Sequence, residues 1–173
     1  MTLPESTKQP EPWLRGNHAE VGAVKRAVLH ALELADEDIQ RWCGNLSEDE
    51  LNARPAGIAP IVFHLRHVAR SLDRLLTYAE GDQLDVTQMT ALKSELDSAS
   101  NGREAMAEFS NALARSTARI RAIDPGTFEN SRAVGRRQLP TTVGGLLVHI
   151  ADHTQRHVGQ AITTAKVVVA QRS

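Results

Sequence analysis

The chain has 173 residues, of which 41% are hydrophobic and only 3% aromatic, and its formal net charge is −1. This length suits one domain with a sizeable core. Because aromatic rings are so few, the core must consist of Ala, Leu, Val and Ile, a mixture that favours helix packed on helix. The charge balance lacks the basic excess that is typical of nucleic-acid-binding proteins, and it indicates no strongly charged membrane partner.

Cysteine content and the N-terminal sequence predict a cytoplasmic location. The one cysteine, Cys43, can form no intrachain disulfide, and we interpret it as a small hydrophobic residue near a helix end. The first residues, MTLPESTKQPEP, contain prolines and charges but not the apolar stretch of a signal peptide. Since no run of 18 apolar residues occurs, we expect no membrane span.

Residues 1–16 contain three prolines and are expected to form an irregular lead-in to a single domain over residues 17–173. An amphipathic helix is predicted from Asn17, a suitable N-cap, to Gly44, because apolar residues recur there at intervals of three and four. In the loop that follows, Ser47 precedes a glutamate by three residues. This capping-box pair predicts one short helical turn.

Three further segments show the periodicity of long amphipathic helices. They lie at residues 59–80, 103–123 and 141–168. A short extra helix is expected over residues 86–98, between the second and third long helices, and residues 127–140 are either irregular or a short hairpin. Four long helices on connections of this length predict an all-α four-helix bundle.

Histidines are the most informative residues for function. His153 and His157 are four residues apart on the fourth long helix, so their rings lie one turn apart on one face and can point at a common ion. A third histidine from a neighbouring helix would complete a three-histidine site with one open position for water or substrate. On the second helix, His64 and His67 project to roughly one side, and periodicity does not choose between them.

The alternative is that these histidines are hydrogen-bonded core residues, the usual role of a single histidine in an apolar stripe. However, His149, His153 and His157 stand in register at intervals of four. Burying several imidazoles without partners costs on the order of a few kcal/mol for each unsatisfied polar group, whereas one metal ion would satisfy them together. His18 and His30 stand singly on the first helix and are interpreted as solvated or structural.

Two segments resemble the metal-ligand segments of DinB-like proteins. They are APIVFHLRHVA at residues 59–69 and TVGGLLVHIADHTQRHVGQ at residues 142–160. The resemblance implies an up-down-down-up four-helix bundle, commonly dimeric, with a metal held by one histidine of helix two and two of helix four. Carried over residue by residue, it assigns three metal ligands: His67, His153 and His157. His64 fits the pattern less well and is kept as a supporting or alternative ligand, while His149 has no ligand counterpart and is expected to pack or to support the site.

The resemblance also implies a function. Characterised relatives include transferases that use low-molecular-weight bacterial thiols, and some apparent hydrolases. We therefore expect a divalent-metal-dependent transferase, with zinc or nickel, that acts as a homodimer with a small thiol on an electrophilic small molecule. The alternatives are a metal-dependent hydrolase, a non-catalytic metal-bound bundle with a structural or stress-related role, and a plain helical dimer with packed histidines. No nucleic-acid or membrane partner is expected.

Several charged and polar residues are further candidates for binding or catalysis. Four arginines can bind the carboxylate or phosphate of a thiol, although solvated surface charge is the commoner role: Arg66, Arg132, Arg136 and Arg137. Asp73 and Asp152 can act as an acid or base or support a ligand. Gln160 can hydrogen-bond a bound molecule.

Overall fold

Helices account for most of the chain in the computed structural model, which describes residues 9–93 and 101–172. The long helices are α1 Ala23–Cys43, α3 Ile61–Glu80, α5 Gly102–Ala122 and α6 Val143–Ala170. The short helices α2 Glu48–Asn52 and α4 Val86–Lys93 lie in the connections, and the antiparallel strands β1 Ser131–Val134 and β2 Leu139–Thr142 form a hairpin before α6. The predicted all-α four-helix bundle is confirmed. The first part of the expected lead-in and the end of the expected helix 86–98 lie outside the described residues.

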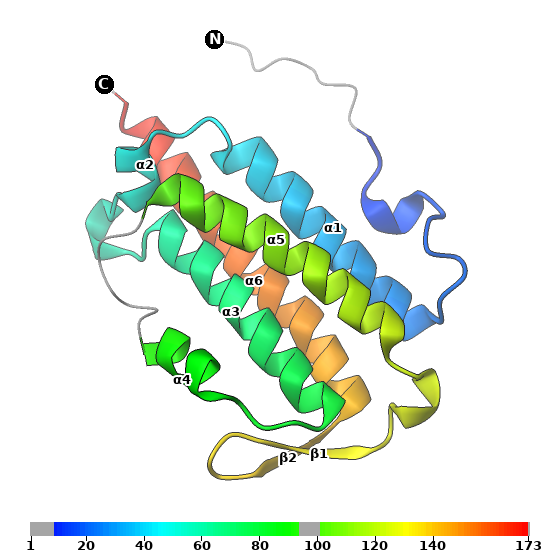
Figure 1. Cartoon of the computed structure of the whole chain (residues 1–173). Helices are drawn as coiled ribbons and strands as arrows, with labels where there is room; N and C mark the ends of the chain where they lie inside the picture. Colours follow the sequence, from blue (N-terminus) through cyan, green and yellow to red (C-terminus); the bar gives the residue numbers. More distant parts are fainter. Residues whose placement is uncertain (1–8, 94–100, 173) are drawn as a thin grey trace.

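The four long helices run up, down, down and up (Figure 1). Near the start of α1, the Nζ of Lys25 donates to the carbonyl oxygen of Arg121 near the end of α5, at 2.8 Å, so these two helices are antiparallel. Arg119, near the end of α5, pairs with Glu80 at the end of α3, at 2.7 Å, so α5 and α3 are parallel. This is the helix order that the resemblance to DinB-like proteins implied.

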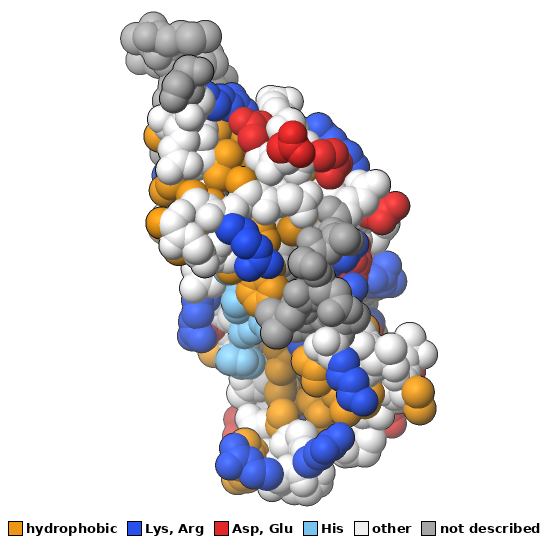
Figure 2. Space-filling view, turned by 90° about the vertical axis from the view of Figure 1, so that its left-hand side faces the viewer, with side chains coloured by type: hydrophobic (Ala, Val, Ile, Leu, Met, Phe, Trp, Pro, Cys, Tyr) orange, Lys and Arg blue, Asp and Glu red, His pale blue; other side chains and the backbone are white. Residues whose placement is uncertain are grey.

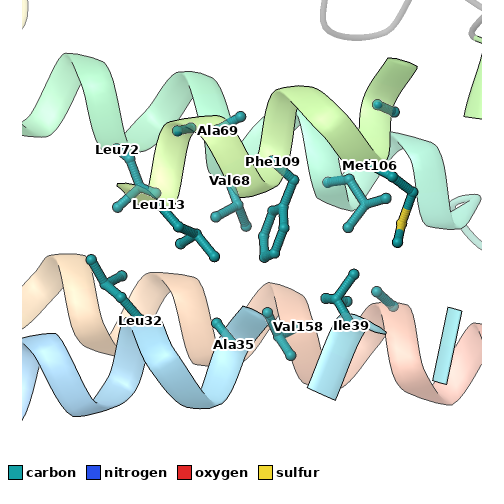
Figure 3. Packing of buried hydrophobic residues seen from close by; sticks show 14 of the residues in the cluster. Leu32, Ala35, Ile39, Val68, Ala69, Leu72, Met106, Phe109, Leu113 and Val158 are labelled. Carbon is teal, nitrogen blue, oxygen red and sulfur yellow. The ribbon is translucent and has the colours of Figure 1, made fainter. Parts of the chain in front are cut away.

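Aliphatic residues and one phenylalanine fill the space between the long helices (Figure 3). The residues labelled there come from all four helices: Leu32, Ala35 and Ile39 from α1, Val68, Ala69 and Leu72 from α3, Met106, Phe109 and Leu113 from α5, and Val158 from α6. Phe109 is fully buried among them. Burial of each large aliphatic or aromatic side chain stabilises the fold by about 1.5–3 kcal/mol. This cluster therefore provides most of the free energy that holds α3 against α6.

The short helix α2 lies between the end of α1 and the start of α3, and it packs against the start of α5. Its N-cap, Ser47, and Glu50 exchange the two hydrogen bonds of a capping box, as predicted. The carboxylate of Glu48 accepts two backbone N–H groups at the start of α5, at 2.5 and 3.0 Å, where negative charge is favourable. A Cβ atom on Gly102 would lie 2.6 Å from the side chain of Leu51, so this close approach of α5 to α2 requires glycine.

The first helix begins at Ala23, so the prediction that Asn17 is its N-cap was wrong. Asn17 instead donates from its side chain to Glu33 of α1, at 2.8 Å. The next residue, His18, has φ +58°, which is incompatible with a helix. Side-chain contacts with α1 therefore hold this segment in a turn that local sequence preferences do not indicate.

The remaining boundaries agree closely with the sequence. Gly81 ends α3 in the left-handed conformation, with φ 98°, as is typical of a helix-ending glycine. Pro60 is the N-cap of α3, so this helix begins at Ile61 and not at residue 59 as predicted. Of the two possibilities for residues 127–140, the structure has the hairpin, preceded by a 3₁₀ turn at Pro125–Thr127.

None of the described helices combines the length and the hydrophobicity needed to cross a membrane. Cys43, the last residue of α1, is fully buried, and burial raises the pKa of its thiol to about 12. The thiol is therefore neutral at pH 7 and packs as a small hydrophobic group, as interpreted from the sequence.

Candidate metal centre

Three imidazole rings converge between α3 and α6. His67 comes from α3, and His153 and His157 come from successive turns of α6. One ring nitrogen from each lies within 4.8 Å of those from the other two. The ring centroids are 4.4, 4.7 and 5.0 Å apart, so the rings form a nearly equilateral triangle. The structure thus brings together the three residues that the sequence analysis singled out.

The antiparallel packing of α3 and α6 positions these rings. Along the two helices His64 lies opposite His157 and His67 lies opposite His153, in reverse order. The rings of His67, His153 and His157 are partly exposed, whereas His64 is buried. Histidine side chains accordingly reach the molecular surface in Figure 2. The triangle therefore has a buried side, closed by the bundle, and an open side that faces solvent.

The distances between ring nitrogens fit a shared cation. The Nε2 atoms of His67 and His153 are 3.1 Å apart. Two nitrogens bound to one tetrahedral zinc ion, each 2.0–2.1 Å from it, would be roughly 3.4 Å apart. Two neutral imidazoles that face each other this closely need a proton between their nitrogens or a cation beside them, because two lone pairs repel. These residues therefore fit a metal ion.

Burial keeps part of the cluster neutral. Burial, followed by the charges of neighbouring rings, lowers the pKa of His153 from 6.5 to about 4. The same causes, burial first, lower the pKa of His64 to about 4. Both rings are therefore neutral at pH 7, the form in which an imidazole nitrogen can bind a metal or accept a hydrogen bond.

The sequence profile of the DinB superfamily matches residues 31–161, a range that includes all three converging rings. The chain belongs to the DinB superfamily. A crystal structure of a conserved protein from Enterococcus faecalis is similar to it, with 22% sequence identity and a TM-score of 0.63 over 87% of this chain and 100% of that chain. At this identity the likeness shows the fold alone. No curated protein matches the chain.

The remaining histidines of this DinB-superfamily protein lie at the edge of the triangle or away from it. His149 precedes His153 by one turn of α6, and about half of its side chain is exposed. His18 lies before α1, not on it as expected, and bonds to a carboxylate of that helix. His30 is buried, with its Nε2 atom 2.9 Å from Oδ1 of Asn17. The last two are structural, one of the two roles considered for them.

The four candidate arginines have other contacts. The Nε atom of Arg66 lies 3.6 Å from the carboxylate of Glu108 on α5. Arg132 donates from Nε to a backbone carbonyl at the far end of α3, at 2.9 Å. Arg136 and Arg137 are exposed in the hairpin turn. The structure therefore does not gather these four side chains around the three rings.

The candidate carboxylates also have arginine partners. Asp73 pairs with Arg119 of α5 at 2.8 Å, and Asp152 pairs with Arg156, one turn later on α6, at 2.7 Å. Gln160 is exposed on α6. Among the described residues, neither carboxylate belongs to the group of side chains that can share one ion.

One side chain beside the rings was missed by the sequence analysis. Ser71 follows His67 by one turn of α3 and is buried. Its Oγ atom lies 3.5 Å from Nε2 of His67 and accepts a hydrogen bond from Nη2 of Arg74 at 3.0 Å. The available signal was its position, four residues after a candidate ligand on the same helix face.

Proposed function

We propose that His67, His153 and His157 hold one divalent metal ion, zinc or nickel, and that the protein joins a small thiol to an electrophilic small molecule. The observation that carries this proposal is the approach of three ring nitrogens, from two helices, to within 4.8 Å of one another. Both metals accept imidazole ligands. We further propose a cytoplasmic homodimer, following the resemblance to DinB-like proteins.

When bound, a divalent ion with three neutral imidazole ligands supplies positive charge that lowers the pKa of a thiol to near neutrality. The chain's contribution is to keep the ring of His153 neutral and to leave one side of the triangle open. Burial lowers the pKa of His153 to about 4, so this ring needs to lose no proton before it binds at pH 7. The partial exposure of all three rings gives a small molecule access to the open side.

His64 has a supporting role in this proposal. Its Nδ1 atom lies 3.1 Å from Nδ1 of His157, so we assign the other nitrogen of His157, Nε2, to the metal. A histidine ligand generally donates its second ring N–H to a partner, and this bond fixes the orientation of the ring. The buried, neutral ring of His64 is suited to accept that bond.

In the proposed reaction the thiol loses its proton to solvent on binding, and its sulfur attacks an electrophilic carbon of the second substrate. A carbon–sulfur bond forms, and the leaving group departs with the electrons of the bond that breaks. The three histidines hold their positions throughout and exchange no proton with either substrate.

Metal analysis of protein purified without a histidine tag tests the site. We expect about one equivalent of metal in the wild type and a large loss in His153→Ala. His149→Ala is the matched control, because His149 lies one turn away on the same helix with an exposed side chain. Equal metal content in all three proteins would overturn the ligand assignment.

A screen of small thiols against a model electrophile tests the reaction. We expect a thioether product that requires the thiol and disappears both in His153→Ala and after metal removal. A metal-dependent product that contains water instead of the thiol would identify a hydrolase. If the metal-loaded protein yields no product above background with any thiol, the proposal of a transferase fails and the metal-bound, non-catalytic bundle remains.

A further inference from the structure

A cavity of about 570 Å³ lies between α1, α6 and the 3₁₀ turn Pro12–Leu14. Gln155 of α6 lines this cavity, and its Nε2 atom donates to the backbone carbonyl oxygen of Ala31 on α1 at 2.7 Å. Gln155 stands between His153 and His157 in the sequence, and residues two apart on a helix point about 200° apart. The cavity therefore lies on the far side of α6 from the proposed metal site. Its volume is within the usual range of small-molecule pockets.

Apolar side chains form most of the lining. Residues of α1 at intervals of three and four lie along one side of it: Ala23, Arg26, Ala27, His30, Ala31 and Leu34. The three alanines, in successive turns, make a flat floor because no long side chain rises from these positions. Trp13, with an exposed fraction of 61%, forms another wall. Its Nε1 atom donates to Glu11 at 2.9 Å, so what the indole offers a ligand is its apolar ring.

Side-chain contacts hold the segment before α1 in place, so the cavity exists without a ligand. Arg15 pairs with Glu37 of α1 at 2.7 Å. Asn17 donates to Glu33 at 2.8 Å, and its Oδ1 atom lies 2.9 Å from Nε2 of His30. This segment contains the blue turn beside α1 in Figure 1. A preformed site loses less free energy to ordering when it binds a ligand.

Arg26 gives the cavity its positive charge, and its side chain is partly buried. In the described part of the chain, no group accepts a hydrogen bond from its guanidinium or forms an ion pair with it. His30, one turn later, bonds to Asn17 through Nε2, and its other ring nitrogen has no hydrogen-bond partner among the same residues. The glutamates of the adjoining segments already have partners: Glu11, Glu33 and Glu37. A guanidinium without a carboxylate, in apolar surroundings, favours an anionic ligand.

We propose that this cavity binds a small aromatic carboxylate, independently of the metal ion. The guanidinium of Arg26 donates two parallel hydrogen bonds to the carboxylate. The aromatic part lies between the indole of Trp13 and the alanines of α1, because a flat apolar ring matches both surfaces. The volume of the cavity admits two fused rings. This binding goes beyond the proposed reaction, whose metal ligands point to the other side of α6.

Isothermal titration calorimetry in the presence of a chelator tests the proposal. The two probes are 2-naphthoate and the uncharged 2-naphthamide, which has nearly the same shape. We expect the wild type to bind 2-naphthoate about tenfold or more tightly than 2-naphthamide, and Arg26→Gln to reduce this preference to less than about twofold. If the wild type binds both probes equally, or binds neither, the proposal is refuted.

Two further variants test the location. Ala27→Leu fills the floor of the cavity at an exposed position of α1, so it should weaken 2-naphthoate about tenfold or more while the circular dichroism spectrum stays that of the wild type. Arg41→Gln is the matched control for charge, because Arg41 is exposed on the same helix, outside the lining, beside the ring of Trp42. It should bind 2-naphthoate as the wild type does. Unchanged binding by Ala27→Leu, or equal weakening by Arg41→Gln and Arg26→Gln, would overturn the assignment to this cavity.

Discussion

Acidification should destabilise the metal-free protein well above the pH at which its carboxylates titrate. In the folded state burial, followed by the neighbouring rings, lowers the pKa of His64 and of His153 from 6.5 to about 4. In the unfolded state each ring regains an ordinary pKa near 6.5. Unfolding therefore takes up protons between pH 6.5 and about 4. The free energy of unfolding is unaffected by these groups above pH 6.5 and falls as the pH is lowered through this window.

The buried ring of His64 sets the magnitude. A pKa of 6.5 in the unfolded chain and about 4 in the folded one corresponds to about 3 kcal/mol over the whole window. About 2 kcal/mol of this is lost between pH 7 and pH 5. His153 is partly exposed, so solvent screening makes its share smaller. Since a domain is typically stable by about 5–15 kcal/mol, the total is a large fraction of its stability.

Urea denaturation at pH 7, 6 and 5 in the presence of a chelator measures this loss. The informative variant is His64→Asn, whose amide can occupy the position of the ring Nδ1 atom without taking up a proton. It should lose about 2 kcal/mol less than the wild type between pH 7 and pH 5. His149→Ala, which alters an exposed ring, should retain the wild-type pH dependence. If His64→Asn and the wild type show the same pH dependence, the ring of residue 64 is not held neutral by burial.

Four substitutions test the packing that supports the site, each by the free energy of unfolding in urea. Phe109→Ala should lose about 3–5 kcal/mol, because this fully buried ring lies at the centre of the core; a loss below about 1 kcal/mol would contradict its central place. Gly102→Ala should destabilise by about 1–3 kcal/mol, since the new Cβ would lie 2.6 Å from Leu51, whereas Gly159→Ala, with no atom within 4 Å of the new Cβ, should stabilise by up to about 1 kcal/mol. If Gly102→Ala were more stable than Gly159→Ala, the close approach of α2 and α5 would be refuted. Glu48→Gln should destabilise by about 1 kcal/mol, because it removes the negative charge that caps the start of α5. An unchanged free energy of unfolding would show that the charge of this cap is dispensable.

Features that depend on one helix could be predicted from the sequence, and those that depend on two could not. The spacing of His153 and His157 places their rings on one face whatever the helix packs against. Which of His64 and His67 joins them depends on how α3 is rotated against α6, and packing of the whole core sets this rotation. Periodicity left the choice open, and the resemblance to DinB-like proteins selected His67 by its sequence pattern alone.

The start of α1 illustrates the same limit. Asn17 has the properties of an N-cap, but its contact with Glu33 belongs to a turn that forms only once α1 exists. Ser71 is different, because it lies on the same helix as His67. Its position four residues after that histidine was available in the sequence, whereas its hydrogen bonds were not.

The burial of Cys43 has a consequence for the proposed reaction with an electrophile. Reactive carbon compounds alkylate exposed thiolates, and an enzyme that concentrates them risks modifying itself. With its pKa raised to about 12 and its side chain inaccessible, the sole sulfhydryl of this chain is shielded from such damage. The protein should therefore survive incubation with iodoacetamide-type reagents at neutral pH without gaining mass on cysteine, and any alkylated sulfur in such an assay would come from the added thiol.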